Sequence, residues 1–172
     1  MILLLYGKGS KKEGILMKTD YERLNSQLKA MTDSVPYLIA NLANASALLY
    51  QTLQDINWAG FYIIKEDKLI LGPFQGKPAC IEIPVGKGVC GKAVETDGVQ
   101  CIKNVHDFPG HIACDQESNS EIVIPIHYNN TVWGVLDIDS PTLSRFEEDD
   151  INGLTQFVNI IEKKINDKSC IA

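Results

Sequence analysis

The segment 121–139, EIVIPIHYNNTVWGVLDID, contains two runs of β-branched and aromatic residues separated by Asn129 and Asn130. Such runs favour strands, and Asn tolerates the positive φ that a tight turn requires. The segment therefore predicts a β-hairpin with one strand over 121–127 and a second over 131–139.

Two acidic residues, Asp137 and Asp139, interrupt the second strand of this hairpin. Side chains alternate between the two faces of a strand, so both carboxyl groups share one face while Leu136 and Ile138 turn toward the core. Like charges side by side repel, and at least one of the pair then has a raised pKa or a bonded partner. The face is either a solvated surface or a carboxyl cluster with a neutral, proton-donating member. A register that pairs Glu121 with this strand would add a third carboxyl group.

The sequence on either side of this hairpin predicts further helices and strands. Helical periodicity, β-branched runs and turn residues give their bounds. We expect a helix over 20–30, a helix over 36–53 with Asp33 or Ser34 as its N-cap, strands over 58–64 and 69–71 joined by a polar turn at 65–68, a strand over 81–83, a helix over 89–95, a short strand containing Cys101, a long loop over 103–120 and a helix over 147–164. Because hairpins prevail and no βαβ alternation is present, the order predicts an α+β fold with an antiparallel sheet. Helices from both ends of the chain are expected to cover one face.

The composition is that of one globular domain. The chain has 172 residues, 45% of them hydrophobic and 22% charged, which suits a single domain with a sizeable core. The net charge of −6 argues against nucleic acid or an anionic membrane as a partner. Five cysteines are too few for a disulfide scaffold and odd in number, which favours reduced thiols and a cytoplasmic location.

The amino terminus is interpreted separately from the domain. Residues 1–6 are apolar but too few to span a bilayer, and the basic residues that follow them do not fit a secretory signal. We expect 1–16 to be an upstream extension, with translation normally beginning at Met17, or else a disordered segment. The remaining bounds are a single domain over 17–168 and a tail over 169–172.

One cysteine, Cys114, lies in the polar loop FPGHIACD at 108–115. Loops display reactive groups, and backbone N–H groups or His111 there would favour a thiolate, whereas Asp115 would oppose one. The alternative for any single cysteine is a small buried hydrophobic residue. A zinc site is a weaker alternative, because no paired C-x₂₋₄-C spacing supports it although His106 and His111 lie near Cys114.

Five segments of the chain are distinctive when taken together: LGPFQGKPAC at 71–80, GKGVCG at 86–91, FPGHIACD at 108–115, SNSEIV at 118–123 and GVLDIDS at 134–140. They resemble the free methionine-(R)-sulfoxide reductase family, whose members are single-domain GAF proteins. The resemblance extends from about residue 21 to about residue 165. It implies a GAF-like six-stranded antiparallel sheet flanked by helices from both termini, usually in a homodimer.

The resemblance also implies roles for individual residues. Cys101 and Cys170 match no functional position of the family. Cys114 is the implied nucleophile, and Cys80 and Cys90 are the implied resolving thiols. Glu121, Asp137 and Asp139 are implied to surround the substrate, with Glu121 and Asp139 among the candidate proton donors. Trp58 and Tyr62 are the implied aromatic pair that encloses the substrate.

The implied reaction is the reduction of free methionine sulfoxide by Cys114. A neutral carboxylic acid activates the sulfoxide oxygen, the thiolate attacks sulfur, and the resulting sulfenic acid condenses with a second thiol to a disulfide. Thioredoxin is the implied reductant, and neither a cofactor nor a metal is needed. The alternative function is a non-catalytic GAF module that senses a small molecule or redox state; a zinc- or haem-binding sensor is weaker still.

Overall fold

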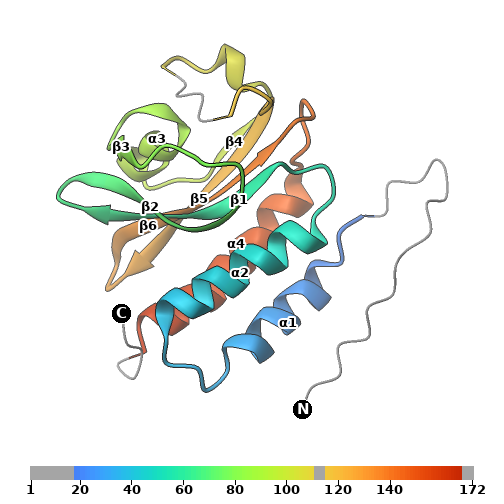
Figure 1. The fold of residues 1–172 in the computed structure, drawn as a ribbon, viewed down its shortest axis with the longest axis vertical. Coiled ribbons are helices and arrows are strands. Elements are labelled where there is room, and N and C mark those ends of the chain that lie inside the picture. The colour runs from blue at the N-terminus through green and yellow to red at the C-terminus, as the bar shows by residue number, and fades with distance from the viewer. Residues whose placement is uncertain (1–17, 111–114, 168–172) are drawn as a thin grey trace.

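The computed structural model describes residues 18–110 and 115–167 (Figure 1). Its elements, in chain order, are α1 (Tyr21–Thr32), α2 (Leu38–Thr52), β1 (Trp58–Lys65), β2 (Lys68–Gly76), β3 (Glu82–Pro84), α3 (Gly88–Thr96), β4 (Gln100–Ile102), the short 3₁₀ helix η1 (Val105–Asp107), β5 (Ser120–Tyr128), β6 (Thr131–Ser140) and α4 (Glu148–Ile165). The strands form one sheet of order β3-β2-β1-β6-β5-β4, and each neighbouring pair is antiparallel.

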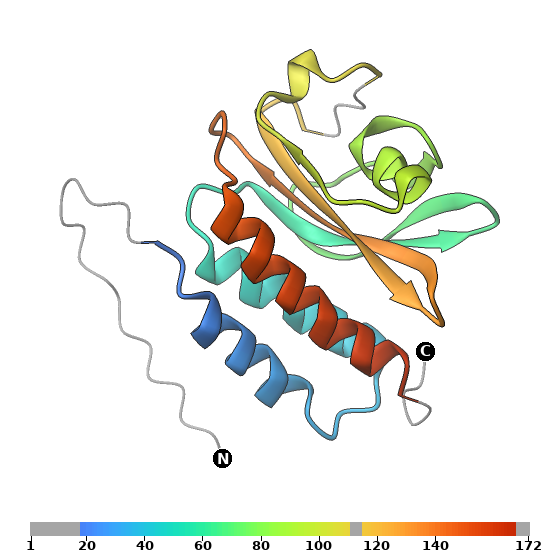
Figure 2. The same ribbon diagram turned by 180° about the vertical axis from the view of Figure 1, so that it is seen from behind.

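The sheet separates two layers of helices. Figures 1 and 2 show α1, α2 and α4 together on one face, while α3 lies alone on the other. The predicted α+β fold, with helices from both ends of the chain on one face, is confirmed. The other predicted helices and strands are present, with most ends shifted by one to three residues.

The central hairpin of the sheet is the one predicted from 121–139. Asn129 and Asn130 form its two-residue turn with φ values of 50° and 60°, the left-handed conformation that matches the twist of the flanking strands. Leu136 and Ile138 lie on the helix-covered face, as alternation predicts, within the apolar core formed with α1, α2 and α4.

The first hairpin differs from its prediction in two respects. Its turn contains two residues rather than four, because Glu66 and Asp67 both adopt positive φ and allow Lys65 to pair with Lys68. Strand β2 also continues to Gly76, well beyond the predicted end at residue 71. Pro73 is tolerated there because β3 pairs only with the first residues of β2, so the missing N–H removes no ladder bond on that side.

The start of α2 is a second correction. The helix begins at Leu38 and its N-cap is Tyr37, not Asp33 or Ser34. Pro36 disfavours a helical conformation in the residue before it, which delays the helix. The side chain of Asn41 donates to the carbonyl oxygen of Val35 at 3.0 Å and ties this entry segment to the first turn.

Each face of the sheet buries its own apolar cluster. On the larger face, α1 packs so closely on α4 that a Cβ at Gly153 would clash with the ring of Tyr21. On the opposite face, Val89 and Ala93 of α3 pack against Val123 and Val135 of the central strands. No helix in the described ranges is both long enough and apolar enough to cross a bilayer.

Candidate active site

Of the two alternatives that the sequence left open for Asp137 and Asp139, the structure has the carboxyl cluster, which lies on the α3 side of the sheet. Glu121 on β5 is the cross-strand partner of Asp139 on β6, and Asp137 pairs with Val123 two residues away. Glu121 and Asp137 are each only 6% exposed. The register that brings the third carboxyl group to the pair is thus confirmed.

A pocket opens between these strands, α3 and the segment that follows β2. It contains six of the eight residues to which the resemblance assigns roles. Cys80 follows the lining residue Ala79 but is not in the lining itself, and Cys114 lies outside the described residues. The lining residues are Trp58, Tyr62, Lys77, Pro78, Ala79, Ile83, Gly88, Val89, Cys90, Asp115, Ser118, Glu121, Asp137 and Asp139.

Helix α3 inserts a thiol into the carboxyl cluster. Cys90 lies in its first turn, is 3% exposed and is a free cysteine. Its Sγ is 4.0 Å from Oε1 of Glu121. Within residues 18–110 and 115–167, the donor atoms of Cys90, Glu121 and Asp137 are the one group of three that lie close enough, within 4.8 Å of one another, to hold a metal ion.

Burial gives this cluster an unusual affinity for protons. Desolvation, followed by the charges of its neighbours, raises the pKa values of Glu121 and Asp139 well above those of ordinary carboxyl groups. Desolvation also raises the pKa of Asp137, but hydrogen bonds from Cys90 and Glu121 oppose that rise and leave it at about 6. The cluster therefore combines neutral carboxylic acids with one carboxyl group that ionises near neutrality.

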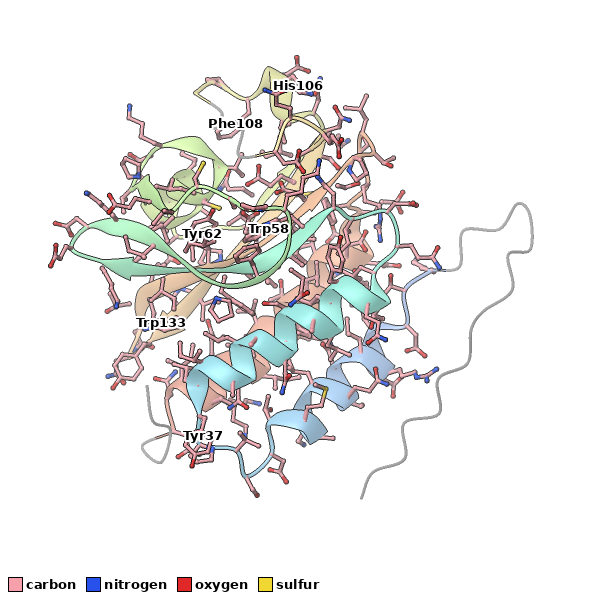
Figure 3. The ribbon with its side chains drawn as sticks, viewed as in Figure 1. Tyr37, Trp58, Tyr62, His106, Phe108 and Trp133 are labelled. Carbon is pink, nitrogen blue, oxygen red and sulfur yellow. The ribbon has the colours of Figure 1, made fainter. Side chains whose placement is uncertain are left out.

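An aromatic wall stands beside the cluster. The ring of Trp58 stacks on Tyr62 at 5.9 Å and on Phe74 at 5.3 Å between centroids. Figure 3 shows Trp58 and Tyr62 next to each other on β1. Gly60 makes room for this stack, because a Cβ there would clash with Phe74 and lie 2.6 Å from the indole. The indole donates to the carbonyl oxygen of Lys77 at 3.2 Å.

The tyrosine of this wall also holds the segment that carries Cys80. The hydroxyl of Tyr62 donates to the carbonyl oxygen of Cys80 at 3.0 Å. Burial and the nearby acidic groups raise the pKa of Tyr62, so this hydroxyl keeps its proton. The side chains of Trp58 and Tyr62 are almost fully buried, at 2% and 1% exposure, and they form a fixed wall of the pocket.

The rim of the pocket is polar, and the sequence did not single it out. Asp115 accepts from Asn57 at 3.1 Å and from Lys77 at 3.4 Å. The backbone N–H of Glu117, together with these side chains, lowers the pKa of Asp115. Lys77 and Ser118 were missed, although each precedes a predicted site residue by three positions in the sequence.

The cysteines divide into three groups. Cys80 is disulfide-bonded, whereas Cys90 and Cys101 are free. Cys101 lies on β4 outside the pocket, with its Sγ 3.6 Å from the carbonyl oxygen of Phe146. Cys114 and Cys170 lie outside the described residues, as does His111.

A six-stranded antiparallel sheet with helices on one face and a pocket on the other is the architecture of a GAF domain. A comparison with protein families agrees, because the GAF domain family matches residues 31–165. The chain therefore belongs to the GAF family, as the sequence predicts.

Individual relatives narrow this assignment. The chain is 55% identical over 143 residues to the free methionine-R-sulfoxide reductase of Escherichia coli (strain K12), which is 83% of this chain and 87% of the relative. Among solved structures it resembles fRMsr of Staphylococcus aureus in complex with substrate, with a TM-score of 0.83, 49% identity and coverage of 86% and 97% of the two chains. It also resembles the free methionine-R-sulfoxide reductase of Neisseria meningitidis in complex with its substrate, with a TM-score of 0.82, 39% identity and coverage of 84% and 87%. The chain belongs to the free methionine-R-sulfoxide reductase family.

Proposed function

We propose that this protein reduces free L-methionine-(R)-sulfoxide to methionine. The observation that carries the proposal is the meeting of Glu121, Asp137 and Asp139 beside an aromatic wall, in a chain that belongs to this reductase family. A free amino acid differs from a protein-bound residue by its ammonium group, and buried carboxyl groups are suited to bind it through charge-assisted hydrogen bonds.

The three carboxyl groups have different roles in the proposed reaction. Asp137 has the lowest pKa of the cluster and serves as the carboxylate that binds the ammonium group. Glu121 and Asp139 retain protons, and one of them donates to the sulfoxide oxygen. Protonation makes the sulfur electrophilic, and oxygen can then leave sulfur as the hydroxyl of a sulfenic acid. Trp58 and Tyr62 enclose the side chain of the substrate.

The electrons come from cysteine. We propose that the thiolate of Cys114 attacks the protonated sulfoxide and forms an S–S bond to its sulfur. The hydroxyl group then passes from that sulfur to the sulfur of Cys114 as the S–S bond breaks, so that methionine leaves with the bonding electron pair and Cys114 becomes a sulfenic acid. The neighbouring Asp115 is less unfavourable to a thiolate than its charge alone suggests, because Lys77 lies 3.4 Å from its carboxylate. This places a compensating cation at the residue that follows the proposed nucleophile in the sequence.

The oxidised enzyme is then returned to its starting state. The thiol of Cys80 displaces hydroxide from the sulfenic acid, forming a disulfide and water, and the two thiols of thioredoxin reduce that disulfide by exchange. The disulfide-bonded state of Cys80, with Cys90 free, supports Cys80 as the resolving thiol. No cofactor or metal enters the cycle. A thioredoxin-dependent cycle places the protein in a reducing compartment, for which we propose the cytoplasm.

We further propose that the protein is a homodimer, as is implied by its family. The exposed apolar side chains of Met31, Tyr37, Ile39 and Tyr50, on and between α1 and α2, are candidates for the covered surface. Light scattering on the purified protein measures the mass in solution, and a monomer across the micromolar range would contradict this part of the proposal.

The activity is tested by supplying each epimer of free methionine sulfoxide with dithiothreitol and measuring methionine by chromatography. Release from the R epimer and not from the S epimer is the expected result. If neither epimer is turned over, the pocket belongs to a sensor rather than to a reductase. Stoichiometric zinc or iron in the purified protein would contradict the metal-free thiol chemistry.

A further inference from the structure

The surroundings of Cys90 are buried and acidic, which does not suit a resolving thiol. Cys90 lies in the first turn of α3, 3% exposed, with its Sγ pointing into the carboxyl cluster. The groups that face it are all acids: Glu121 from β5, Asp137 and Asp139 from β6, and the hydroxyl of Tyr62 from β1. Lys77, the one basic residue of the described lining, pairs instead with Asp115 and Glu117 at the rim.

This environment determines the chemical state of the thiol. Burial, followed by the negative charge of Asp137, raises the pKa of Cys90, so the sulfur keeps its proton. A protonated thiol is a poor nucleophile for disulfide exchange but remains a hydrogen-bond donor. The structure also leaves Cys90 free while Cys80 is disulfide-bonded.

The neighbouring carboxyl group has an unused acceptor. Oδ1 of Asp137 is buried and has no hydrogen-bond partner among the described residues. A buried carboxylate oxygen without a donor is costly, and a ligand that supplies N–H groups removes that cost. The Sγ of Cys90 lies within 4.8 Å of an oxygen of the same carboxyl group and 4.0 Å from Oε1 of Glu121, and hydrogen bonding of the thiol to Asp137 lowers the pKa of that carboxyl group.

We propose that Cys90 is a positioning residue that acts through Asp137: its S–H donates to the carboxylate and holds Oδ1 ready for the ammonium group of the free amino acid. The inference rests on the proposed function. It replaces the resolving role that the family resemblance implied for Cys90 with a role in recognising a free amino acid. Resolution is then left to Cys80.

Two substitutions separate these roles. Cys90→Ser keeps a donor of similar size, whereas Cys90→Ala removes it. With thioredoxin as reductant and the free R epimer as substrate, Cys90→Ser should turn over many times, with KM and kcat within about threefold of the unmodified protein. Cys90→Ala should also turn over many times, but with KM raised about tenfold at pH 6. The rise should shrink toward pH 8, where Asp137 ionises without help from the thiol.

Cys101→Ala is the matched control, because it removes a thiol that lies outside the pocket. Its KM should be unchanged at every pH. A purely structural role for Cys90 would lower thermal stability in Cys90→Ala without a pH-dependent KM.

Two results would overturn the proposal. If Cys90→Ser releases about one methionine per active site and then stalls with thioredoxin, Cys90 is a resolving thiol. If KM in Cys90→Ala is unchanged, or is raised equally at pH 6 and pH 8, the thiol does not act through Asp137. Failure of the unmodified protein to turn over the free R epimer with dithiothreitol is a different outcome, which would reject the proposed function itself.

Discussion

Glu121 and Asp139 face each other across β5 and β6, and both line the pocket under α3. The pairing places two carboxyl groups on neighbouring strands. Asp137 lies two residues before Asp139 on β6 and therefore on the same face of the sheet. Because burial raises the pKa values of both groups, the protein holds neutral carboxylic acids where a sulfoxide oxygen would need a proton. The predictions below test this cluster and the thiols beside it.

Two isosteric substitutions should separate binding from proton transfer. Asp137→Asn removes the carboxylate that binds the ammonium group and should raise KM about 10- to 100-fold with kcat changed much less. Glu121→Gln removes one of the two candidate proton donors and, if that group is the donor, should lower kcat by about 10²- to 10³-fold. Steady-state kinetics measure both effects. Asp67→Asn, in the exposed turn after β1, is the control and should change neither constant.

The pH dependence of KM should follow Asp137. Its pKa of about 6 means that the carboxylate is lost as pH falls through that value. KM for the free sulfoxide should therefore rise progressively below about pH 6 and level off above pH 7. A KM that is flat between pH 5 and pH 8 would contradict the role given to this carboxyl group.

The same cluster should make the protein less stable as pH rises. The pKa values of Glu121 and Asp139 are higher in the folded than in the unfolded protein. At pH values between the unfolded and the folded pKa, the folded state therefore binds more protons than the unfolded state. Their contribution to the free energy of unfolding is therefore fully present below about pH 4 and is lost as pH rises toward the folded pKa values. His127, whose pKa is raised by Glu162 and Asp97 against its desolvation, contributes in the same direction above about pH 6.5.

Glu121→Gln isolates the cluster from His127. The amide stays neutral at every pH. The free energy of unfolding of this variant at pH 8 should therefore exceed that of the parent by about 1–3 kcal/mol. The difference should narrow at pH 5. Urea denaturation at both pH values is the measurement, with the exposed Glu66→Gln as control. A variant that is less stable than the parent at pH 8 would mean that Glu121 is ionised and stabilised in the folded protein.

Cys114→Ser should abolish turnover, reducing kcat by at least about 10³-fold with dithiothreitol or thioredoxin. A hydroxyl group near neutral pH lacks the nucleophilicity of a thiolate. Activity above about a tenth of the parent value in this variant would place the nucleophile at another cysteine.

Cys80→Ser should separate attack from resolution. Cys114 can still attack once, so rapid quenching should count about one methionine per active site, after which the reaction stalls with thioredoxin. Dithiothreitol is small enough to reduce the sulfenic acid directly and should restore some turnover. Sustained turnover with thioredoxin would show that another thiol resolves Cys114.

Much of the carboxyl cluster could be predicted from local sequence. The Asn129–Asn130 turn by itself would pair Glu121 with Ile138; the register shift between Ile126 and His127 moves the partner to Asp139, and the sequence did not predict that shift. Two-residue alternation, in contrast, assigned Asp137 and Asp139 to one face from adjacent positions, where strand geometry leaves few alternatives. The same holds for the helices at the two ends of the chain, whose periodicity is strong.

The environment of Cys90 could not be predicted in the same way. Its contact with Glu121 joins positions 31 residues apart, and it depends on how α3 lies over the sheet. Periodicity shows that a helix forms there but not which strand it covers. The rim formed by Lys77, Asp115 and Asn57 depends equally on long-range contacts.

The most direct test of the account is the comparison of free L-methionine-(R)-sulfoxide with its N-acetylated form as substrates of the unmodified protein. Acetylation removes the positive charge and leaves the sulfoxide unchanged. If the buried carboxyl groups bind the ammonium group, kcat/KM should be at least about 100-fold higher for the free amino acid, since a buried charge partner would be left unpaired by the acetylated one. Equal kcat/KM values for the two substrates would contradict the role of the cluster in selecting a free amino acid.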